Sequence, residues 1–188
     1  EPGLLERAGE LAARVIRPGR AAVVADGHVA PLYGERLSAS LRQAGFSPVL
    51  YVFPPGESSK NMGVLTDLLN FLAKSGLTRS DTVFALGGGV TGDLAGLAAA
   101  LYLRGINLVQ LPTTLLAAVD SSVGGKTAVD LDAGKNLAGA FYQPDLVLFD
   151  PGTLKTLPEE EFSGGCAEVI KYAMIRDFSL LEALADRE

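Results

Sequence analysis

A short apolar run followed by closely spaced glycines places the strongest constraint on the fold of this chain. Thr82 to Leu86 has the composition of a buried β-strand. Gly87, Gly89 and Gly92 follow in G-x-G-x-x-G spacing, and the Ala- and Leu-rich run from Asp93 to Leu103 predicts a helix. Glycine permits a tight turn and lets backbone N–H groups approach a pyrophosphate at the positive end of a helix. The pattern therefore favours a nucleotide phosphate site between the strand and the helix.

This dinucleotide fingerprint is incomplete. A standard Rossmann unit carries an acidic residue at the end of its next strand, where the carboxylate holds a ribose hydroxyl. Here the next strand, Ile106 to Leu111, ends in Pro112-Thr113-Thr114. The alternative is a tight turn that needs glycine only for packing. The spacing favours phosphate binding over that alternative, but it does not predict the standard Rossmann version.

Composition limits the class of protein. The 188 residues are 48% hydrophobic and 20% charged, enough for one sizeable domain, or for one domain and part of another. The formal charge of −6 argues against general binding to nucleic acid or to anionic membranes. The single Cys166, expected to be a small packed residue, excludes an internal disulfide and fits a reducing cytoplasm. The N-terminus does not resemble a signal peptide.

Strands alternate with helices over the first 150 residues, which predicts an α/β fold: a Rossmann-like parallel sheet with right-handed crossovers and helices on both faces. The helix before the central strand is expected to bury Met62, Leu65, Leu68, Leu69 and Leu72. Strands are predicted at 21–25, 48–53, 82–86, 106–111 and 146–149, and helices at 4–15, 29–44, 62–75 and 93–103.

The character of the sequence changes at Pro151. A turn at 153–158 precedes two predicted helices, at 159–162 and 166–176. We therefore expect a domain at 1–150 and, at 151–188, the start of an all-helical domain. The chain ends at Glu188 in helical sequence without a cap signal, and it is predicted to be a fragment.

Polar residues follow several of the predicted strands: Asp26, Glu57 with Lys60, Asp93, and Thr113 with Thr114. The carboxyl ends of parallel strands share one edge of a sheet, where ligands bind. These residues are therefore expected to line one crevice. The alternative, that each is a helix cap or loop residue, stays open.

The segment from Asp120 to Thr127 invites comparison with a P-loop. It fails as one, because G-x-x-x-x-G-K-T requires glycine at the position of Asp120. Lys126 beside small residues could still bind a phosphate as a point charge. Lys135 and Asn136 add a second lysine and an amide.

Glu168 and Lys171 lie three residues apart and therefore share one face of a predicted helix. Their neighbours are mostly apolar, which predicts that more than half of this helix is buried. A solvated ion pair is the alternative. In a buried setting, a metal ligand beside an anion-binding lysine is favoured.

Five motifs together resemble the 3-dehydroquinate synthase family of the sugar-phosphate cyclase superfamily. The resemblance covers residues 21–177 and rests on PPGESSK, GGGVTGDLAGLAAALYLRG, LPTTLLAAVDSSVGGKTAVD, KNLAGAFYQPDLV and SGGCAEVIKY. It implies NAD on a Rossmann-like domain, a zinc (or cobalt) site largely in a helical C-terminal domain, and a homodimer. The implied substrate, 3-deoxy-D-arabino-heptulosonate 7-phosphate, lies between the domains and yields 3-dehydroquinate and phosphate in the shikimate pathway.

The resemblance also implies roles for particular residues. Residues implied to bind NAD are Asp26, Glu57, Lys60, Gly88, Gly89, Val90, Gly92, Asp93, Thr113, Thr114, Lys126, Lys135, Thr153, Leu154, Lys155 and Thr156. Residues implied to bind the substrate are Arg104, Asp120, Lys126, Asn136 and Lys171, of which Asp120, Lys126 and Lys171 are the implied catalytic residues. Glu168 is the implied first metal ligand.

The chain departs from the family pattern at a few points. Ala118 stands where the family usually has Gln, and Asp130 where it often has Asn. The two zinc histidines of the family and the strands that usually precede position 1 are absent, so no turnover is expected from this chain alone. Three alternatives remain: another sugar-phosphate cyclase, a metal-dependent polyol dehydrogenase (whose turn usually reads GGGS), and a non-catalytic NAD-binding module.

Overall fold

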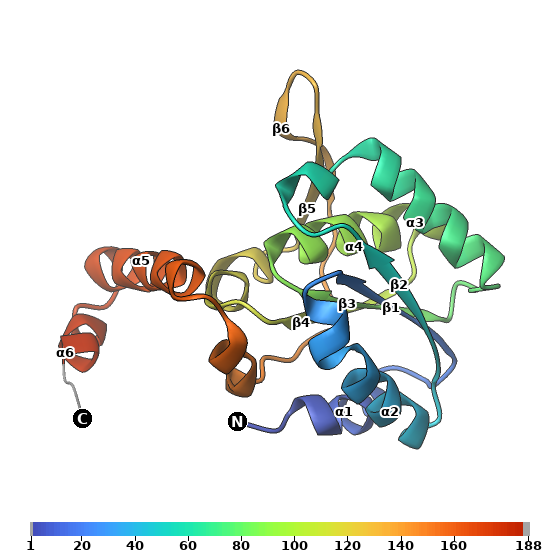
Figure 1. Ribbon diagram of the computed structural model, residues 1–188, viewed down its shortest axis with the longest axis horizontal. Helices are drawn as coiled ribbons and strands as arrows, with labels where there is room; N and C mark the ends of the chain where they lie inside the picture. Colours follow the sequence, from blue (N-terminus) through green and yellow to red (C-terminus); the bar gives the residue numbers. More distant parts are fainter. Residues whose placement is uncertain (1, 186–188) are drawn as a thin grey trace.

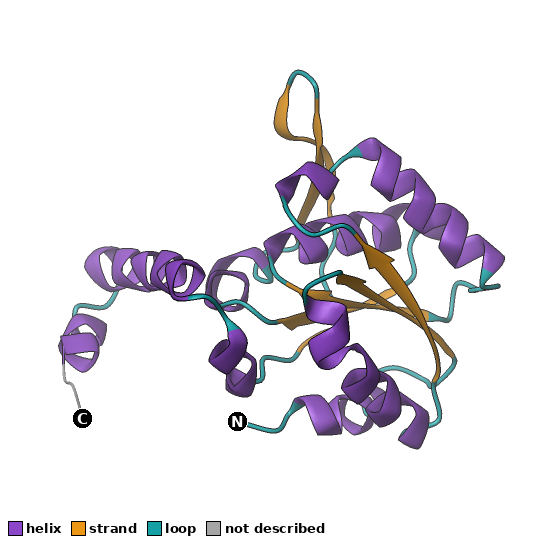
Figure 2. Ribbon diagram, in the orientation of Figure 1, coloured by secondary structure: helices purple, strands orange, loops and turns teal. Residues whose placement is uncertain are grey.

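The computed structural model describes residues 2–185 and is built on a five-stranded sheet (Figure 2). Its order is β2-β1-β3-β4-β7, and every neighbouring pair is parallel. The strands are β1 (Arg20–Asp26), β2 (Ser47–Phe53), β3 (Thr82–Gly87), β4 (Asn107–Pro112) and β7 (Leu146–Val147). The predicted parallel sheet and all five of its strands are confirmed.

Alternating side chains of the central strands supply two separate cores. Ala22 and Val24 of β1 face α3 and α4, whereas Val23 faces α1 and α2 on the other side. Because β1 and β3 are covered on both faces, their sequences are continuously apolar rather than alternating. The covering helices are α1 (Ala8–Ala13), α2 (Glu35–Gln43), α3 (Met62–Lys74) and α4 (Gly89–Leu101) (Figure 1).

A β-hairpin that the sequence did not predict stands beside α4 (Figure 1). It consists of β5 (Lys126–Leu131) and β6 (Gly134–Phe141), paired antiparallel. Val129 is fully buried in the core under α3 and α4. A Cβ added at Gly96 of α4 would come within 2.5 Å of Thr127 Cγ2, so the small residue lets β5 approach the helix.

Several predicted helix boundaries are wrong. The helix after the glycine turn begins at Gly89 rather than Asp93, because the glycines themselves form its first turn. Residues 159–175 form one helix, α5, because Gly164 and Gly165 continue the helix instead of breaking it. Met62 is 47% exposed rather than buried, since it occupies the first position of α3.

Short helical turns lie at Leu5–Arg7 (η1), Ala30–Gly34 (η2), Glu57–Ser59 (η3), Tyr102–Arg104 (η4), Ala117–Ser121 (η5) and Pro151–Thr156 (η6).

The two C-terminal helices lie to one side of the sheet (Figure 1). They are α5 (Glu159–Ile175) and α6 (Ser179–Ala185). The prediction that α5 is more than half buried is wrong within residues 2–185. Its Gly165 and Ala173 are buried, whereas Ile170 and Met174 are exposed, because none of the described elements covers that face. None of the described helices combines the length and the apolar composition that crossing a membrane requires.

Candidate functional site

The carboxyl edge of the sheet gathers residues from separate parts of the chain. β1 ends at Asp26, β3 at Gly87 and β4 at Pro112, and parallel pairing places these ends together. Asp26 Oδ1 accepts the backbone N–H groups of His28 and Val29, at 2.8 and 2.9 Å. The predicted common edge is therefore confirmed, and the helix-cap alternative also holds for Asp26.

The glycine turn at this edge is tightly enclosed. A Cβ at Gly87 would lie 2.3 Å from Thr91 Oγ1, so glycine is needed there for packing alone. A Cβ at Gly88 would lie 3.1 Å from Thr114 Cγ2, and one at Gly89 3.3 Å from Ser121 Oγ. No described side chain caps the N-terminus of α4. Its free N–H groups and positive dipole end therefore suit an anion such as a pyrophosphate.

Lys60 joins three elements at the same edge. Its ammonium group is nearly buried and lies 2.5 Å from Asp93 Oδ2 in the first turns of α4. The ammonium also donates to Asn136 Oδ1 at 2.6 Å, while the Lys60 carbonyl accepts the Asp130 N–H at 2.8 Å. Asp130 in turn accepts the Asn136 N–H at 2.7 Å. Asn136 sits in the left-handed region (φ 58°), which its short polar side chain tolerates.

Burial affects the pKa of Asp93. Removal from water raises the pKa of Asp93, and the hydrogen bond and charge of Lys60 offset that effect only in part. The Lys60 ammonium therefore stabilises the ionised form of Asp93. A second lysine, Lys135, pairs with Glu57 at 3.1 Å, but this pair is exposed.

A cleft of about 460 Å³ opens between α4, η5 and the hairpin. It brings together Asp93, Asp120, Lys126 and Asn136, which the sequence had singled out. Lys126 Nζ lies 3.8 Å from Asp120 Oδ1. The cleft thus combines acidic, basic and amide groups, a set that suits a polyhydroxylated anionic ligand. Other lining residues are Ser121, Thr127, Ala128, Leu137, Gly139, Ala140 and Phe141.

Glu168 and Lys171 share one face of α5, as predicted, and Lys171 Nζ donates to Glu168 Oε1. This hydrogen bond is the main reason that the pKa of Glu168 is lowered and that of Lys171 raised. Smaller effects come from Lys126 on Glu168 and from Asp120 on Lys171. Because α5 packs against η5, the Glu168–Lys171 pair lies on the side of α5 nearest the element that carries Asp120.

Arg104 lies apart from the cleft. It is exposed in η4, after the C-terminal end of α4 and thus opposite the carboxyl edge of the sheet. Within one copy of the chain, the structure does not bring it to the other predicted substrate residues.

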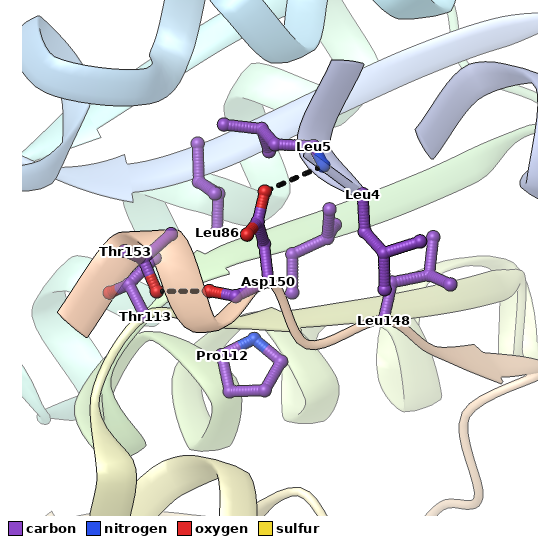
Figure 3. A pocket seen from close by; sticks show the side chains of 9 residues that line it. Leu4, Leu5, Leu86, Pro112, Thr113, Leu148, Asp150 and Thr153 are labelled. Carbon is purple, nitrogen blue, oxygen red and sulfur yellow. Dashed lines mark hydrogen bonds between the residues drawn. The ribbon is translucent and has the colours of Figure 1, made fainter. Parts of the chain in front are cut away.

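The turn η6 also lies at the carboxyl edge. Thr153 is buried there, while Lys155 and Thr156 are exposed. Asp150, at the start of the turn, accepts the N–H groups of Gly3, Leu5 and Gly152. Figure 3 shows the Asp150 carboxylate pointing toward Leu5 and the Thr153 hydroxyl toward the Asp150 backbone.

The family model described as 3-dehydroquinate synthase N-terminal matches residues 50–164, more than half of the chain. The chain belongs to the 3-dehydroquinate synthase family. A curated relative, 3-dehydroquinate synthase of Caulobacter vibrioides, is 56% identical over 184 residues, which cover 97% of this chain and 50% of the relative. The chain spans about half the length of the curated relatives it matches.

Solved structures of related cyclases have the same fold as this family member. One is 2-epi-5-epi-valiolone synthase from Streptomyces hygroscopicus subsp. jinggangensis with NAD⁺ and Zn²⁺ bound, at a TM-score of 0.87 and 36% identity. The superposition covers 98% of this chain and 51% of that one. Another is 2-deoxy-scyllo-inosose synthase complexed with carbaglucose-6-phosphate, NAD⁺ and Co²⁺, at a TM-score of 0.85 and 31% identity over 93% of this chain and 47% of that one.

Residues 2–185 of this family member do not assemble a metal site on their own. No group of three His, Cys, Asp or Glu side chains in that part of the chain could hold a metal ion. Zinc takes three or four protein ligands. Glu168 can contribute one carboxylate ligand.

Sequence reasoning missed Ser121, Asp150, Tyr33 and the hairpin. The Asp132-Ala133 turn followed by Gly134 was the one available sequence signal for the hairpin. Asp150 and Tyr33 act through contacts with residues distant in the sequence, and no local pattern marks them.

Gly165 controls the approach of α5 to the cleft. A Cβ at this position would lie 2.6 Å from Leu115 Cβ and 2.8 Å from the Leu116 nitrogen. Gly165→Ala is therefore expected to push α5 away from η5 and to lower the melting temperature by several degrees. Gly164→Ala is the matched control, since a Cβ there would meet no described atom within 4 Å. Equal melting temperatures for the two variants, measured by thermal denaturation, would contradict the expected clash.

Proposed function

We propose that the whole protein is a 3-dehydroquinate synthase that uses NAD and a metal ion. It would convert 3-deoxy-D-arabino-heptulosonate 7-phosphate to 3-dehydroquinate and phosphate. One observation carries the proposal. In a chain of this family, Asp93, Asp120, Lys126 and Asn136 line one cleft directly beside the glycine turn. A ligand in the cleft would therefore lie next to a cofactor at the sheet edge.

NAD is proposed to lie along the carboxyl edge. The enclosed glycine turn and the uncapped N-terminus of α4 suit its pyrophosphate. Asp26 and the Glu57 to Lys60 loop would hold the adenosine side, and Thr113, Thr114, Lys135 and the η6 turn would complete the pocket. Bound NAD would accept a hydride from the carbon that bears a substrate hydroxyl and would later return it.

The residues of the cleft would bind and orient the substrate. Lys126 in the cleft and Lys171 on α5, outside the lining of the cleft, carry positive charge that suits the carboxylate and the leaving phosphate. Asp120, 3.8 Å from Lys126, can accept a hydrogen bond from a sugar hydroxyl, and Asn136 can donate its amide N–H. Arg104 lies outside the cleft of its own chain, so another copy of the chain would have to bring this side chain to the substrate.

A zinc or cobalt ion is proposed to take Glu168 as one ligand. Its other ligands would lie outside residues 2–185. The domain division at 150/151, a cytoplasmic location and a homodimer remain parts of this proposal. A homodimer has support from the placement of Arg104, since a second copy could bring that side chain to the cleft.

The test is phosphate release from the heptulosonate phosphate by the whole natural protein with NAD, before and after chelation. Release that stops with chelator and returns with zinc or cobalt, with 3-dehydroquinate as product, is the expected result. No release despite confirmed NAD binding would overturn the proposed reaction.

A different cyclase activity is the second candidate. The solved structures at 31% and 36% identity are a 2-deoxy-scyllo-inosose synthase and a 2-epi-5-epi-valiolone synthase, so proteins of this fold include synthases of other products. Product analysis with a seven-carbon sugar phosphate and with a hexose phosphate separates the two candidates.

Lys171→Ala in the whole protein is expected to lower kcat/KM for the sugar phosphate more than tenfold. The lysine is 53% exposed toward solvent and is free to turn from Glu168 to an anion. Steady-state kinetics of Lys171→Ala would measure the change in kcat/KM. The affinity of a Lys155→Ala variant for NAD would be measured in parallel. Kinetics of Lys171→Ala near those of the wild type would remove Lys171 from the proposed substrate site.

Glu168→Gln is expected to lower metal affinity at least as much as loss of an outer-shell partner does, about 10–100-fold, while leaving NAD affinity unchanged. The reason is position: Glu168 lies on α5, whereas the proposed NAD residues lie along the sheet edge and η6. Metal content after dialysis and NAD titration would be measured on the same sample. Unchanged metal stoichiometry would refute the ligand role.

A further inference from the structure

The end of η6 is held by a tyrosine whose ring packs in the core that α1 and α2 cover. Tyr33 lies in η2, just before α2, and is 5% exposed. Its hydroxyl lies 2.6 Å from Thr156 Oγ1 and 3.3 Å from the Thr153 carbonyl oxygen. Thr156 Oγ1 itself donates to the Thr153 carbonyl at 3.1 Å. Either hydroxyl can be the donor in the bond between Tyr33 and Thr156, and both hydroxyls lie within hydrogen-bond distance of the Thr153 carbonyl oxygen.

The start of η6 is held by Asp150, the residue that precedes the turn. Asp150 Oδ1 accepts the Gly152 N–H at 2.8 Å, and the Asp150 carbonyl accepts the Thr153 hydroxyl at 2.8 Å (Figure 3). The same carboxylate binds the N–H groups of Gly3 and Leu5. Both ends of the turn are therefore fixed by contacts from outside it, Asp150 at the beginning and Tyr33 at the end.

Packing accounts for the ring of Tyr33 but not for its hydroxyl. The ring belongs to the core cluster with Leu37 and Leu41, and the Arg36 guanidinium lies 5.5 Å from the ring centroid. A phenylalanine would supply the same ring. A hydroxyl brought to the boundary of an apolar core is costly unless it is hydrogen-bonded, and here it is bonded to η6.

We propose that Tyr33 is a positioning residue for the cofactor, whose hydroxyl fixes Thr156 and the Thr153 carbonyl so that η6 keeps the shape that NAD contacts. This inference rests on the proposed function, because it assumes NAD at the carboxyl edge. Tyr33 does not touch NAD in this arrangement. It acts through the turn, and its loss should weaken NAD binding without removing a contact to the cofactor.

The test compares Tyr33→Phe with Tyr102→Phe in the whole natural protein. The Tyr102 hydroxyl donates to the Leu77 carbonyl at 2.9 Å, beyond the C-terminal end of α4 and away from the carboxyl edge. Each variant loses one hydroxyl bonded to a backbone carbonyl. Calorimetric titration should give a Kd for NAD about three- to tenfold higher for Tyr33→Phe. For Tyr102→Phe the Kd for NAD should be unchanged. Both tyrosine variants should show similar small losses in Tm. At saturating NAD, kcat of Tyr33→Phe should match that of the wild type.

Thr156 tests the route of the effect. Thr156→Val removes the hydroxyl that Tyr33 contacts, and it is expected to weaken NAD binding at least as much as Tyr33→Phe. Adding Tyr33→Phe to Thr156→Val should then raise the Kd little further. A wild-type protein that does not bind NAD would overturn the proposed function. Wild-type binding with an unchanged Kd for Tyr33→Phe, or equal effects of the two tyrosine variants, would overturn the role of Tyr33 alone.

Discussion

Replacement of Lys60 by methionine is expected to lower the free energy of unfolding by about 3–5 kcal/mol, the usual cost of removing one partner from a buried ion pair. Lys60 is 6% exposed, and its ammonium group contacts both Asp93 and Asn136. Without it, the Asp93 carboxylate stays buried without a counter-charge, and the hairpin loses its tie to the sheet edge. Urea unfolding at neutral pH would measure the loss.

Two further variants make this prediction specific. Lys135→Met removes a lysine whose side chain is 71% exposed and paired with Glu57. This variant should lower the free energy of unfolding by less than about 1 kcal/mol. The double variant Lys60→Met/Asp93→Leu removes both buried charges and should recover much of the lost stability. A Lys60 variant no less stable than the Lys135 variant would mean that the cluster at 60, 93 and 136 does not contribute to folding.

The sequence predicted those parts of the fold that local patterns encode. Continuous apolar runs at 21–25 and 82–86 indicated strands covered on both faces, and the structure confirms them. Parallel pairing then placed Asp26, Gly88 and Thr113 at one edge by topology alone. The positions of the glycine turn and the edge residues could therefore be predicted without coordinates.

The rest depends on contacts between distant residues. Lys60 and Asn136 are 76 positions apart and meet only because the unpredicted hairpin turns back onto the sheet edge. Its second strand, with small and polar residues at 134–140, has a weak β-signal. The apolar residues of α5 indicated burial, but apolar composition shows what a helix can bury, not which element covers it. Ile170 and Met174 are accordingly exposed within the described residues.

Asp150→Ala is expected to lower the free energy of unfolding by about 3 kcal/mol at neutral pH, because three backbone N–H groups lose their acceptor at about 1 kcal/mol each. These groups belong to Gly3, Leu5 and Gly152, so the variant should loosen both the N-terminal segment and the η6 turn. Asp145→Ala is a graded control, since Asp145 accepts one N–H group, that of Leu108. Chemical denaturation should therefore show about one third of the effect for Asp145→Ala. Equal losses for the two variants would contradict the prediction.

The cost of Asp150→Ala should also depend on pH. Burial alone would raise the pKa of Asp150, but hydrogen bonds from the Leu5, Gly152 and Gly3 N–H groups outweigh it, and the pKa is lowered. A carboxyl group whose pKa is lower in the folded state adds stability above its unfolded pKa of about 4, and that stability is lost as the pH falls through the folded value. The difference between wild type and Asp150→Ala should thus be full at pH 7 and shrink below about pH 4. A difference that stays constant down to pH 2 would mean that the ionised carboxylate is not what holds the N-terminal segment to η6.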